Sequence, residues 1–354
     1  MPTPRVTVVV LNWNGAAVIR DCLQGLRFQT FRRFSTLVVD NASTDGSPGL
    51  VRREFPEVEL LELRENRGFA GGNNAGIGLL RRTRPTIPYI ALLNNDARPQ
   101  TGWLAALVTA LEERPGMGMA ASKMLRWDGV ADPSIIDCAG TVFYTCGRAD
   151  KRGEGCDAAL FSRPEEVFGA CAGAALYRAG MLDEIGLFDA DLFAYHEDVD
   201  LDLRARWAGW GCWYVPEAVV WHRVGHSARI AGLDTVVLAK RNISWVLIKN
   251  WPASLFLRHG LSVGTYNLLS DLWGILRGRG RAVLAARWAT LRGLPKVLRK
   301  RTRVMGARKI DASEFDRWIV PTPWLRRVGR ALERLLERFG RVVPPAPRGR
   351  SNAR

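Results

Sequence analysis

Several features that would place the chain in a disulfide-linked, zinc-binding or membrane-spanning class are missing from the sequence. The six cysteines include no Cys-x-x-Cys pair and no zinc-type spacing, so we expect reduced thiols in a cytosolic protein. No window supplies the roughly 18 uninterrupted apolar residues that a membrane-spanning helix requires. The opening residues, "MPTPRVTVVV", lack a charged leader and a cleavage site, so no signal peptide is expected. A helix that lies in the membrane interface is compatible with all of these absences.

Acidic residues are scarce in one part of the chain only, the C-terminal region. Residues 281–354 contain 20 basic residues (Lys and Arg) and 5 acidic residues (Asp and Glu). The preceding 280 residues contain 31 basic and 30 acidic residues. The net charge of +16 therefore belongs to the C-terminal region. Because the rest of the chain offers no broad basic surface, we expect no nucleic-acid partner and disfavour a scaffold protein that binds nucleic acid.

The basic region ends in the pattern of an amphipathic helix. Residues 324–341, "WLRRVGRALERLLERFGR", place apolar side chains on one stripe and Arg and Glu on the other face. This pattern favours attachment to an anionic membrane surface over a helical bundle that packs on the rest of the chain or forms a dimer. Residues 342–354 have the composition of a disordered tail. The oligomeric state is left open.

The first half of the chain alternates β-branched runs with helical patterns. The predicted strands are 6–13, 35–40, 58–63 and 89–94. The predicted helices are 15–29, 47–55 and 71–82, and Ser47 before Pro48 predicts an N-cap. Such strand–helix–strand units indicate a parallel sheet, whose ligands bind beyond the carboxyl ends of the strands.

Polar loops follow these strands. Asp40 ends a buried strand, where an ionised carboxylate is costly unless something binds it, so a ligand contact is favoured over a turn. The Gly-rich loop 64–78 lacks the G-x-G-x-x-G spacing, and it fits a close approach to phosphate or a tight turn equally well. The "NND" at 94–96 suits a hard cation such as Mg²⁺ or Mn²⁺, with an Asn/Asp turn as the alternative.

Four acids crowd into "FAYHEDVDLDLRARWAGW", residues 193–210, where a helix is predicted to begin near Asp198. Asp200 and Asp202 each have an arginine four residues later, so ion pairs along the helix explain both. Glu197 and Asp198 have no such cation. The spacing leaves a general base and a stabiliser of the helix N-terminus equally open for these two.

Two histidines, His222 and His226, follow an apolar run in "VVWHRVGHS". By themselves they are explained better as surface histidines than as metal ligands.

Taken together and in this order, these segments resemble the family 2 glycosyltransferases with the GT-A fold, most closely the bacterial rhamnosyltransferase-like branch. The matching segments are "VVVLNWNG", "VVDNASTDGS", "NRGFAGGNNAGI", "LLNNDARP", "GACAGAALYR", "IGLFDADLFAYHEDVDLDLRARWAGW" and "YVPEAVVWHRVGHS". The resemblance implies an α/β fold with a mostly parallel central sheet flanked by helices. It further implies a catalytic domain over 1–227, a helical, basic, membrane-associated extension over 228–341 and the tail 342–354.

The resemblance also assigns roles to matching positions. Asp198 would be the catalytic base, with Glu197 beside it. Asp96 would hold a Mg²⁺ or Mn²⁺ ion, and His222 would complete the metal site. Asn94 replaces the first acid of the family's D-x-D motif, so it would ligate the cation more weakly or bind the sugar instead. The expected nucleotide-sugar-binding residues are Leu11, Asn12, Asp40, Asn66, Gly68, Asn73, Asn94, Asn95, Gly169 and Ala170.

The activity implied is that of an inverting, metal-dependent glycosyltransferase on the cytoplasmic face of the plasma membrane. The favoured donor is dTDP-rhamnose, with other dTDP- or UDP-sugars as alternatives, and the acceptor is a cell-envelope glycan or a lipid-linked molecule. The second candidate is a nucleotidyltransferase-like enzyme. It should carry a basic Gly-rich loop after the first strand, and "LNWNGAAV" has none.

Overall fold

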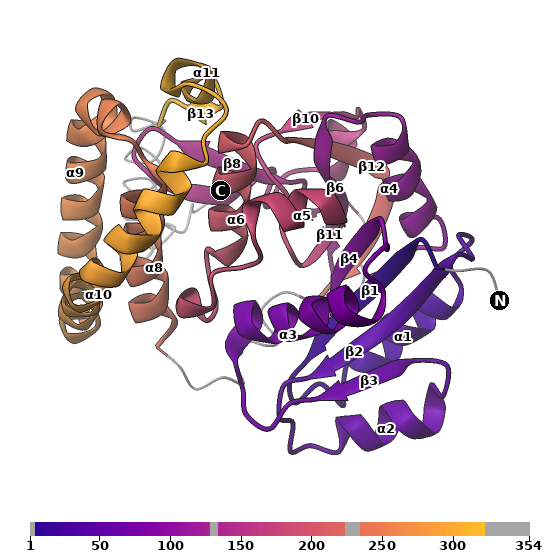
Figure 1. Ribbon diagram of the computed structural model, residues 1–354. Helices are drawn as coiled ribbons and strands as arrows, with labels where there is room; N and C mark the ends of the chain where they lie inside the picture. The colour runs from indigo at the N-terminus through magenta and orange to yellow at the C-terminus, as the bar shows by residue number, and fades with distance from the viewer. Residues whose placement is uncertain (1–3, 128–133, 224–233, 323–354) are drawn as a thin grey trace, which may run out of the picture. The chain divides into compact units, whose positions relative to one another are not determined.

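Strands and helices alternate through the first half of the chain, as the sequence predicts (Figure 1). The structure is a computed structural model, which describes residues 4–127, 134–223 and 234–322. All described helices and strands belong to the first of two units, Met1–Val320 and Pro321–Arg354. The first elements are β1 (Val6–Asn12), α1 (Ile19–Arg27), β2 (Phe34–Asp40), α2 (Ser47–Glu54), β3 (Glu59–Glu62), α3 (Gly68–Thr83) and β4 (Tyr89–Asn94).

The middle of the chain completes one large, mostly parallel sheet. This part of the chain contains β5 (Ala97–Pro99), α4 (Trp103–Glu112), β6 (Met117–Arg126), β7 (Ile136–Cys138), β8 (Thr141–Tyr144), β9 (Ala149–Lys151), η1 (Ala158–Phe161), β10 (Glu165–Val167), β11 (Ala174–Arg178), α5 (Ala179–Ile185), η2 (Ala190–Leu192), α6 (Glu197–Trp207) and β12 (Gly211–His222). Of these, β8 and β9 belong to a separate small sheet with β13 (Ile319–Val320). The strand order is β10-β12-β6-β11-β4-β1-β2-β3, with β5 on β12 and β7 on β6. The strands β3, β2, β1 and β4 are parallel neighbours, whereas β11 runs antiparallel between β4 and β6.

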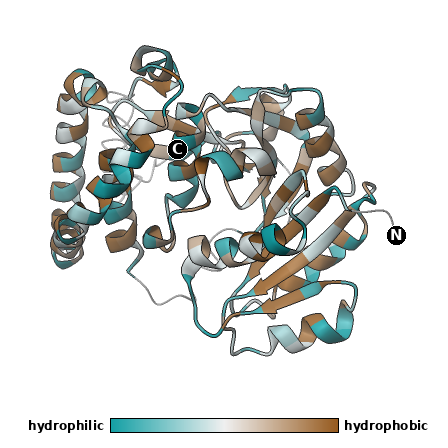
Figure 2. Cartoon of the chain, in the orientation of Figure 1, coloured by the Kyte–Doolittle hydropathy of each residue, from teal (hydrophilic) through white to brown (hydrophobic). Residues whose placement is uncertain are grey.

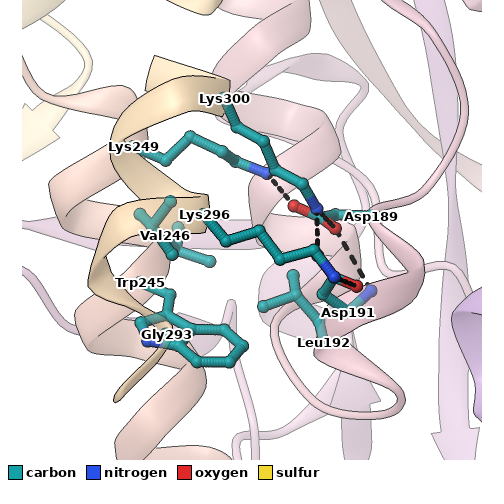
Figure 3. Close-up of a pocket in the computed structure, with 10 residues that line it drawn as sticks. Asp189, Asp191, Leu192, Trp245, Val246, Lys249, Gly293, Lys296 and Lys300 are labelled. Carbon is teal, nitrogen blue, oxygen red and sulfur yellow. Dashed lines mark hydrogen bonds and ion pairs between the residues drawn. The ribbon is translucent and has the colours of Figure 1, made fainter. Parts of the chain in front are cut away.

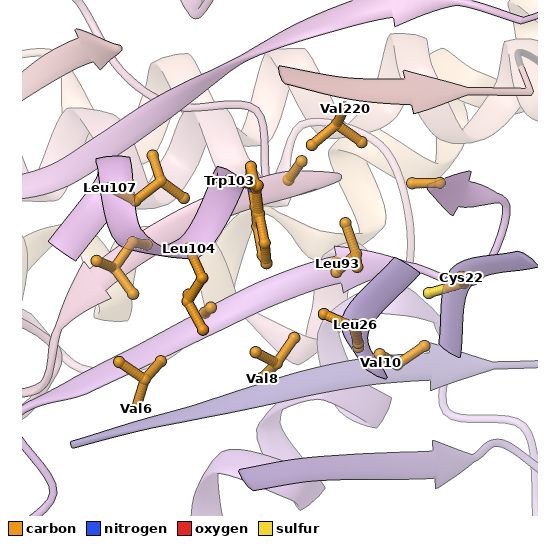
Figure 4. Close-up of a cluster of buried hydrophobic side chains, with 14 of the residues drawn as sticks. Val6, Val8, Val10, Cys22, Leu26, Leu93, Trp103, Leu104, Leu107 and Val220 are labelled. Atoms are coloured by element: carbon orange, nitrogen blue, oxygen red, sulfur yellow. The ribbon is translucent and has the colours of Figure 1, made fainter. Parts of the chain in front are cut away.

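Apolar side chains cover both faces of this sheet, because parallel strands are buried between layers of helices. Val8 and Val10 of β1 share a cluster with Trp103 of α4 (Figure 4), whereas Val9 faces the other cluster with Ile77 of α3. The central strands are accordingly hydrophobic along their length (Figure 2). This double burial holds the strand ends at a fixed edge.

Two predicted helix starts and one predicted N-cap differ from the structure. The helix predicted from residue 15 begins at Ile19. The helix predicted from residue 71 begins at Gly68, where φ is +67° and the backbone N–H donates to Asn66 Oδ1 (2.8 Å). The N-cap prediction for Ser47 is wrong, because Gly46 precedes α2 and Ser47 is its first residue. The Ser47 hydroxyl instead donates to Asp45 Oδ1 (2.6 Å).

The C-terminal extension packs against α6. It contains α8 (Thr235–Asn250), α9 (Ala253–Leu276), α10 (Gly280–Gly306), α11 (Ala312–Asp316) and β13 (Ile319–Val320). Trp207 of α6 stacks on Phe315 of α11 with ring centroids 3.9 Å apart, and Trp251 packs against Phe143 of β8. No described helix is long and apolar enough to cross a membrane. The predicted boundary at residue 227, the helix at 324–341 and the tail at 342–354 lie outside the described residues.

Candidate active site

The carboxyl ends of β1, β2 and β4 meet at one edge of the sheet, and Asn12 joins them. Asn12 is opposite Asp40 in the register of β1 and β2, and its side chain is fully buried. Its Nδ2 donates to Asp40 Oδ1 (3.0 Å) and to Ser47 Oγ (2.8 Å). Its Oδ1 accepts from Asn95 Nδ2 (2.9 Å). Gly15 leaves room for these amides, since a Cβ there would lie within 2.2 Å of both.

Asp40 is satisfied inside the protein. Asn12 donates to one carboxylate oxygen, and the backbone N–H of Ser43 donates to the other (3.0 Å). The residue is 3% exposed. Burial at the strand end therefore does not require a ligand, contrary to the sequence argument, and the nucleotide contact of Asp40 stays a prediction.

Asn41, which the sequence analysis did not single out, organises the loop before α3. Its Nδ2 donates to Asn66 Oδ1 (2.9 Å) and Gly68 O (3.1 Å). Its Oδ1 accepts from the backbone N–H of Arg67 (2.9 Å). In contrast, Asn73 is buried and donates to a carbonyl of its own helix. The nucleotide-binding roles of Asn66, Gly68 and Asn73 remain predictions.

Asp96 and His222 come together where β5 pairs with β12. Asp96 is buried, and its Oδ1 lies 3.2 Å from His222 Nε2, with which it forms an ion pair when the ring is protonated. The amide nitrogen of Asn94 lies 3.3 Å from the same ring nitrogen. The sequence therefore selected two adjacent side chains. Within the described ranges, no three acidic, Cys or His side chains form a metal-binding cluster by themselves.

Asp137 of β7 is a second residue that the sequence analysis missed. Its Oδ2 lies 2.9 Å from His222 Nδ1, and its Oδ1 accepts from Lys151 Nζ (2.7 Å). Burial disfavours the charged imidazole, but the carboxylates of Asp137 and Asp96 outweigh burial and raise the pKa of His222 to about 10. The one available signal was an acid inside the apolar run "SIIDCAG".

The acids Glu197 and Asp198 begin α6. Asp198 is partly exposed, and its Oδ1 accepts from the backbone N–H of Val199 (2.8 Å). Glu197 is 7% exposed, and its Oε2 has no hydrogen-bond partner in the described parts of the chain. Burial raises the pKa of Asp198, and burial together with the neighbouring Asp198 raises the pKa of Glu197 well above its usual range. Such an environment suits proton transfer near neutral pH.

The next two acids of α6 have tertiary partners. Asp200 pairs with Arg204 (3.0 Å), as predicted, and also with Lys249 of α8 (2.7 Å). The predicted pair of Asp202 and Arg206 is wrong. Asp202 accepts from Thr141 Oγ1 (2.8 Å) and the N–H of Ala170 (3.1 Å), whereas Arg206 pairs with a glutamate of β10 (2.7 Å). Both residues are buried, so long-range partners replace the local pair.

The small-residue loop 169–173 lies between these acids and the strand ends. A Cβ on Gly169 would come within 1.9 Å of Asp202, so only glycine allows the backbone to lie this close to the carboxyl group. Farther along, a backbone N–H donates to Asp198. At its end, the loop accepts a hydrogen bond from the backbone N–H of Asn94 (2.8 Å). One short loop therefore contacts both the acids and the end of β4.

The residues just before α6 adopt a strained backbone. Phe193, Tyr195 and His196 have φ angles of +63°, +74° and +67°. Non-glycine residues in such regions cost on the order of 1–3 kcal/mol each, and they persist only where surrounding contacts hold them. The carbonyl of Phe193 accepts from the N–H of Ala70 (3.0 Å), which links this turn to the first turn of α3.

The sequence matches the family model of glycosyl transferase family 2 over residues 7–186. The chain belongs to glycosyl transferase family 2. This family 2 enzyme is 29% identical over 242 residues to the N-acetylglucosaminyl-diphospho-decaprenol L-rhamnosyltransferase of Mycobacterium tuberculosis, covering 64% of this chain and 78% of that protein. It is 37% identical over 94 residues to the succinoglycan biosynthesis protein ExoO of Rhizobium meliloti, which is 26% of each chain. The predicted resemblance is confirmed, and the glycosyltransferase is favoured over the nucleotidyltransferase alternative.

Solved structures confirm the GT-A fold of this glycosyltransferase. A mannosyltransferase from Pyrobaculum calidifontis, in complex with GDP-Man and Mn²⁺, matches 93% of this chain and 80% of its own length, with a TM-score of 0.50 and 20% identity. GalNAc-T7 with UDP, GalNAc and Mn²⁺ matches 70% of this chain with a TM-score of 0.56 and 13% identity. This chain spans 48% of the length of GalNAc-T7.

Replacing Lys249 by Met should lower the free energy of unfolding by about 3 kcal/mol at pH 7, because Asp189 and Asp200 lose the buried cation that they share and keep only Lys300 and Arg204, respectively. Burial favours protonation of both acids, but Lys249 helps to hold their pKa values below the usual range. Stability from lowered carboxyl pKa values is present above the unfolded pKa of about 3.9 and is lost below it. The difference between variant and wild type should therefore shrink below about pH 4 in urea unfolding.

Lys240→Met is the matched control, since Lys240 pairs with Asp271 at a more exposed position. It should cost no more than about 1 kcal/mol. Equal losses in the two variants, or a pH-independent difference, would contradict the role given to Lys249.

Proposed function

We propose that this glycosyltransferase transfers a sugar, with rhamnose favoured, from a nucleoside-diphosphate donor to a cell-envelope glycan or lipid-linked acceptor with inversion. The observation that carries the proposal is the pair of acids with raised pKa values at the start of α6, joined by loop 169–173 to the polar strand ends. The name of the Mycobacterium tuberculosis relative supports rhamnose and a lipid-linked acceptor. dTDP-rhamnose is the favoured donor, and another dTDP- or UDP-sugar is the alternative.

In the proposed reaction, Asp198 accepts the proton of an acceptor hydroxyl while that oxygen forms a bond to C1 of the donor sugar. The bond from C1 to the diphosphate oxygen breaks, and its electron pair leaves with the nucleoside diphosphate. Attack from the face opposite the leaving group inverts the anomeric centre. Glu197, whose pKa is raised further, stays protonated and avoids a second buried charge beside the base.

A divalent cation fits the group around Asp96. In the described residues, the polar neighbour of the buried Asp96 Oδ1 is His222 Nε2, 3.2 Å away, so one cation could contact both atoms in place of the shared proton. Asp137 would hold the proton on Nδ1 of the neutral imidazole and leave Nε2 free to ligate. We assign Asp96 and His222 to the metal, because Asp96 Oδ1 and His222 Nε2 lie 3.2 Å apart, close enough to contact one ion. Mg²⁺ or Mn²⁺, when bound, would stabilise the negative charge of the diphosphate.

Asp198→Asn should lower kcat for transfer by a factor on the order of 10²–10⁴, because the side chain can no longer accept a proton. Binding of the nucleoside diphosphate should be retained. In the wild type, kcat should fall on the acidic side with a midpoint above the usual carboxyl pKa of about 3.9, since burial raises the pKa of Asp198. A panel of nucleotide sugars with Mg²⁺ or Mn²⁺ measures both effects.

The control for this experiment is Asp183→Asn, at an exposed acid of α5, which should leave kcat unchanged. Full transfer activity in Asp198→Asn would remove the proposed base.

Asp96→Ala and His222→Ala should abolish the gain in nucleoside-diphosphate affinity that Mn²⁺ gives the wild type, as measured by calorimetric titration. Asp137→Asn should weaken Mn²⁺ binding by about 10–100-fold, because Asp137 orients the imidazole. The matched exchange is Asp157→Asn, at the exposed cap of η1, which should change nothing. Nucleotide binding that is insensitive to EDTA in the wild type would argue against the metal.

We further propose peripheral attachment of the extension to the anionic cytoplasmic face of the plasma membrane. The helix predicted for this role lies outside the described residues, but α9 and α10 support the same idea. Leu257, Leu261 and Leu276 of α9 are 88%, 86% and 81% exposed, and Leu284 and Trp288 of α10 are 70% and 68% exposed. Apolar side chains beside basic residues are typical of helices that lie in a membrane interface.

The triple variant Leu257→Ser, Leu261→Ser and Trp288→Ser should lose sedimentation with vesicles of phosphatidylglycerol, because the apolar contact is removed. Wild-type binding should also weaken with rising salt and with neutral phosphatidylcholine. Failure of the wild type to sediment with anionic vesicles at low salt would refute membrane attachment.

A further inference from the structure

The segment Asp189–His196, which leads directly into the proposed catalytic acids, is held between the start of α3 and the extension. Its Phe193 ring packs on Gly68, where a Cβ would come within 2.6 Å of the ring. The backbone around Phe193 and Tyr195 is strained, so its conformation depends on contacts with neighbouring elements.

Asn242 of α8 makes polar contacts that hold the strained backbone of this segment. The residue is fully buried, and its Nδ2 lies 2.8 Å from the carbonyl oxygens of Leu192, Ala194 and Tyr195. Its Oδ1 accepts from Nε (2.9 Å) and Nη2 (2.7 Å) of Arg241. Because a carbonyl cannot donate and a guanidinium cannot accept, these partners fix the orientation of the amide. The NH₂ group therefore gathers three carbonyls of the strained turn.

Ion pairs anchor the beginning of the same segment (Figure 3). Lys249 of α8 and Lys300 of α10 pair with Asp189, and Lys296 and Lys300 pair with Asp191. The extension thus fixes the start of the segment through charge and its strained end through Asn242.

We propose that Asn242 is a positioning residue for sugar transfer, which holds the strained turn so that Asp198 keeps its place relative to the start of α3. The turn touches both partners, since Phe193 O accepts from Ala70 N (3.0 Å) and His196 O accepts from Asp200 N in the first turn of α6 (3.0 Å). Its conformation therefore sets the separation between base and bound donor. The inference rests on the proposed assignment of Asp198 as the base.

Asn242→Asp tests this role. The exchange keeps the size of the side chain and an acceptor for Arg241, but a carboxylate oxygen now repels the three carbonyls. We expect kcat for transfer to fall about 100-fold, because a small displacement of a reacting group has an effect of this size. The donor KM and the Kd of the nucleoside diphosphate should change by less than about threefold.

Asn267→Asp is the matched control. It makes the same exchange in α9, at an asparagine whose Oδ1 also accepts from an arginine, Arg287 (2.9 Å). It should leave kcat unchanged. Hydrogen exchange of residues 189–196 should become faster in Asn242→Asp and stay unchanged in Asn267→Asp.

If Asn242→Asp does not fold, Arg241→Gln at a partly exposed position removes the group that orients the amide. It should lower kcat in the same sense, again with KM retained. An unchanged kcat per folded molecule, or a fall matched by an equal loss of nucleotide affinity, would overturn the positioning role. Full activity in Asp198→Asn would instead overturn the proposed base, so the two failures are distinguishable.

Discussion

The amide of Asn12 is the interaction on which the site depends, because three strand ends meet at it. An amide both donates and accepts, so one side chain can satisfy the carboxylate of Asp40, the hydroxyl of Ser47 and the amide of Asn95 together. In a buried position, each of these groups would be costly without its partner. The polar loops beyond the sheet therefore start from fixed positions.

Much of the fold could be predicted from the sequence. Buried parallel strands appear as continuous apolar runs, and the helices between them show apolar residues at helical spacing. The ion pair of Asp200 and Arg204 could also be predicted, because residues four apart are neighbours on a helix. The partners of Asp202 could not, because a buried carboxyl takes whatever donors the tertiary structure brings, here from Thr141. Asp137 was missed since only folding brings β7 beside His222.

The partners of the basic residues in the C-terminal region could not be predicted from the sequence either. The excess of basic residues near the C-terminus suggested a surface for an anionic partner. That count does not distinguish basic residues that are paired with acids of the same chain from those that are exposed. Lys296 and Lys300 instead neutralise acids that lie more than 100 positions earlier in the chain. Composition gives the number of charges, but it cannot separate those spent inside the molecule from those left for a partner.

The dependence of the turn before α6 on α8 and α10 has a consequence for synthesis of the chain. A ribosome makes the strands and the acids before it makes α8 and α10, and folding can begin at the N-terminal part of a chain during synthesis. The residues that match the family model end at 186, well before Asn242. A nascent chain can therefore form the strands of the sheet early, whereas the contacts of α8 and α10 with the turn before Asp198 form only after those helices have been made.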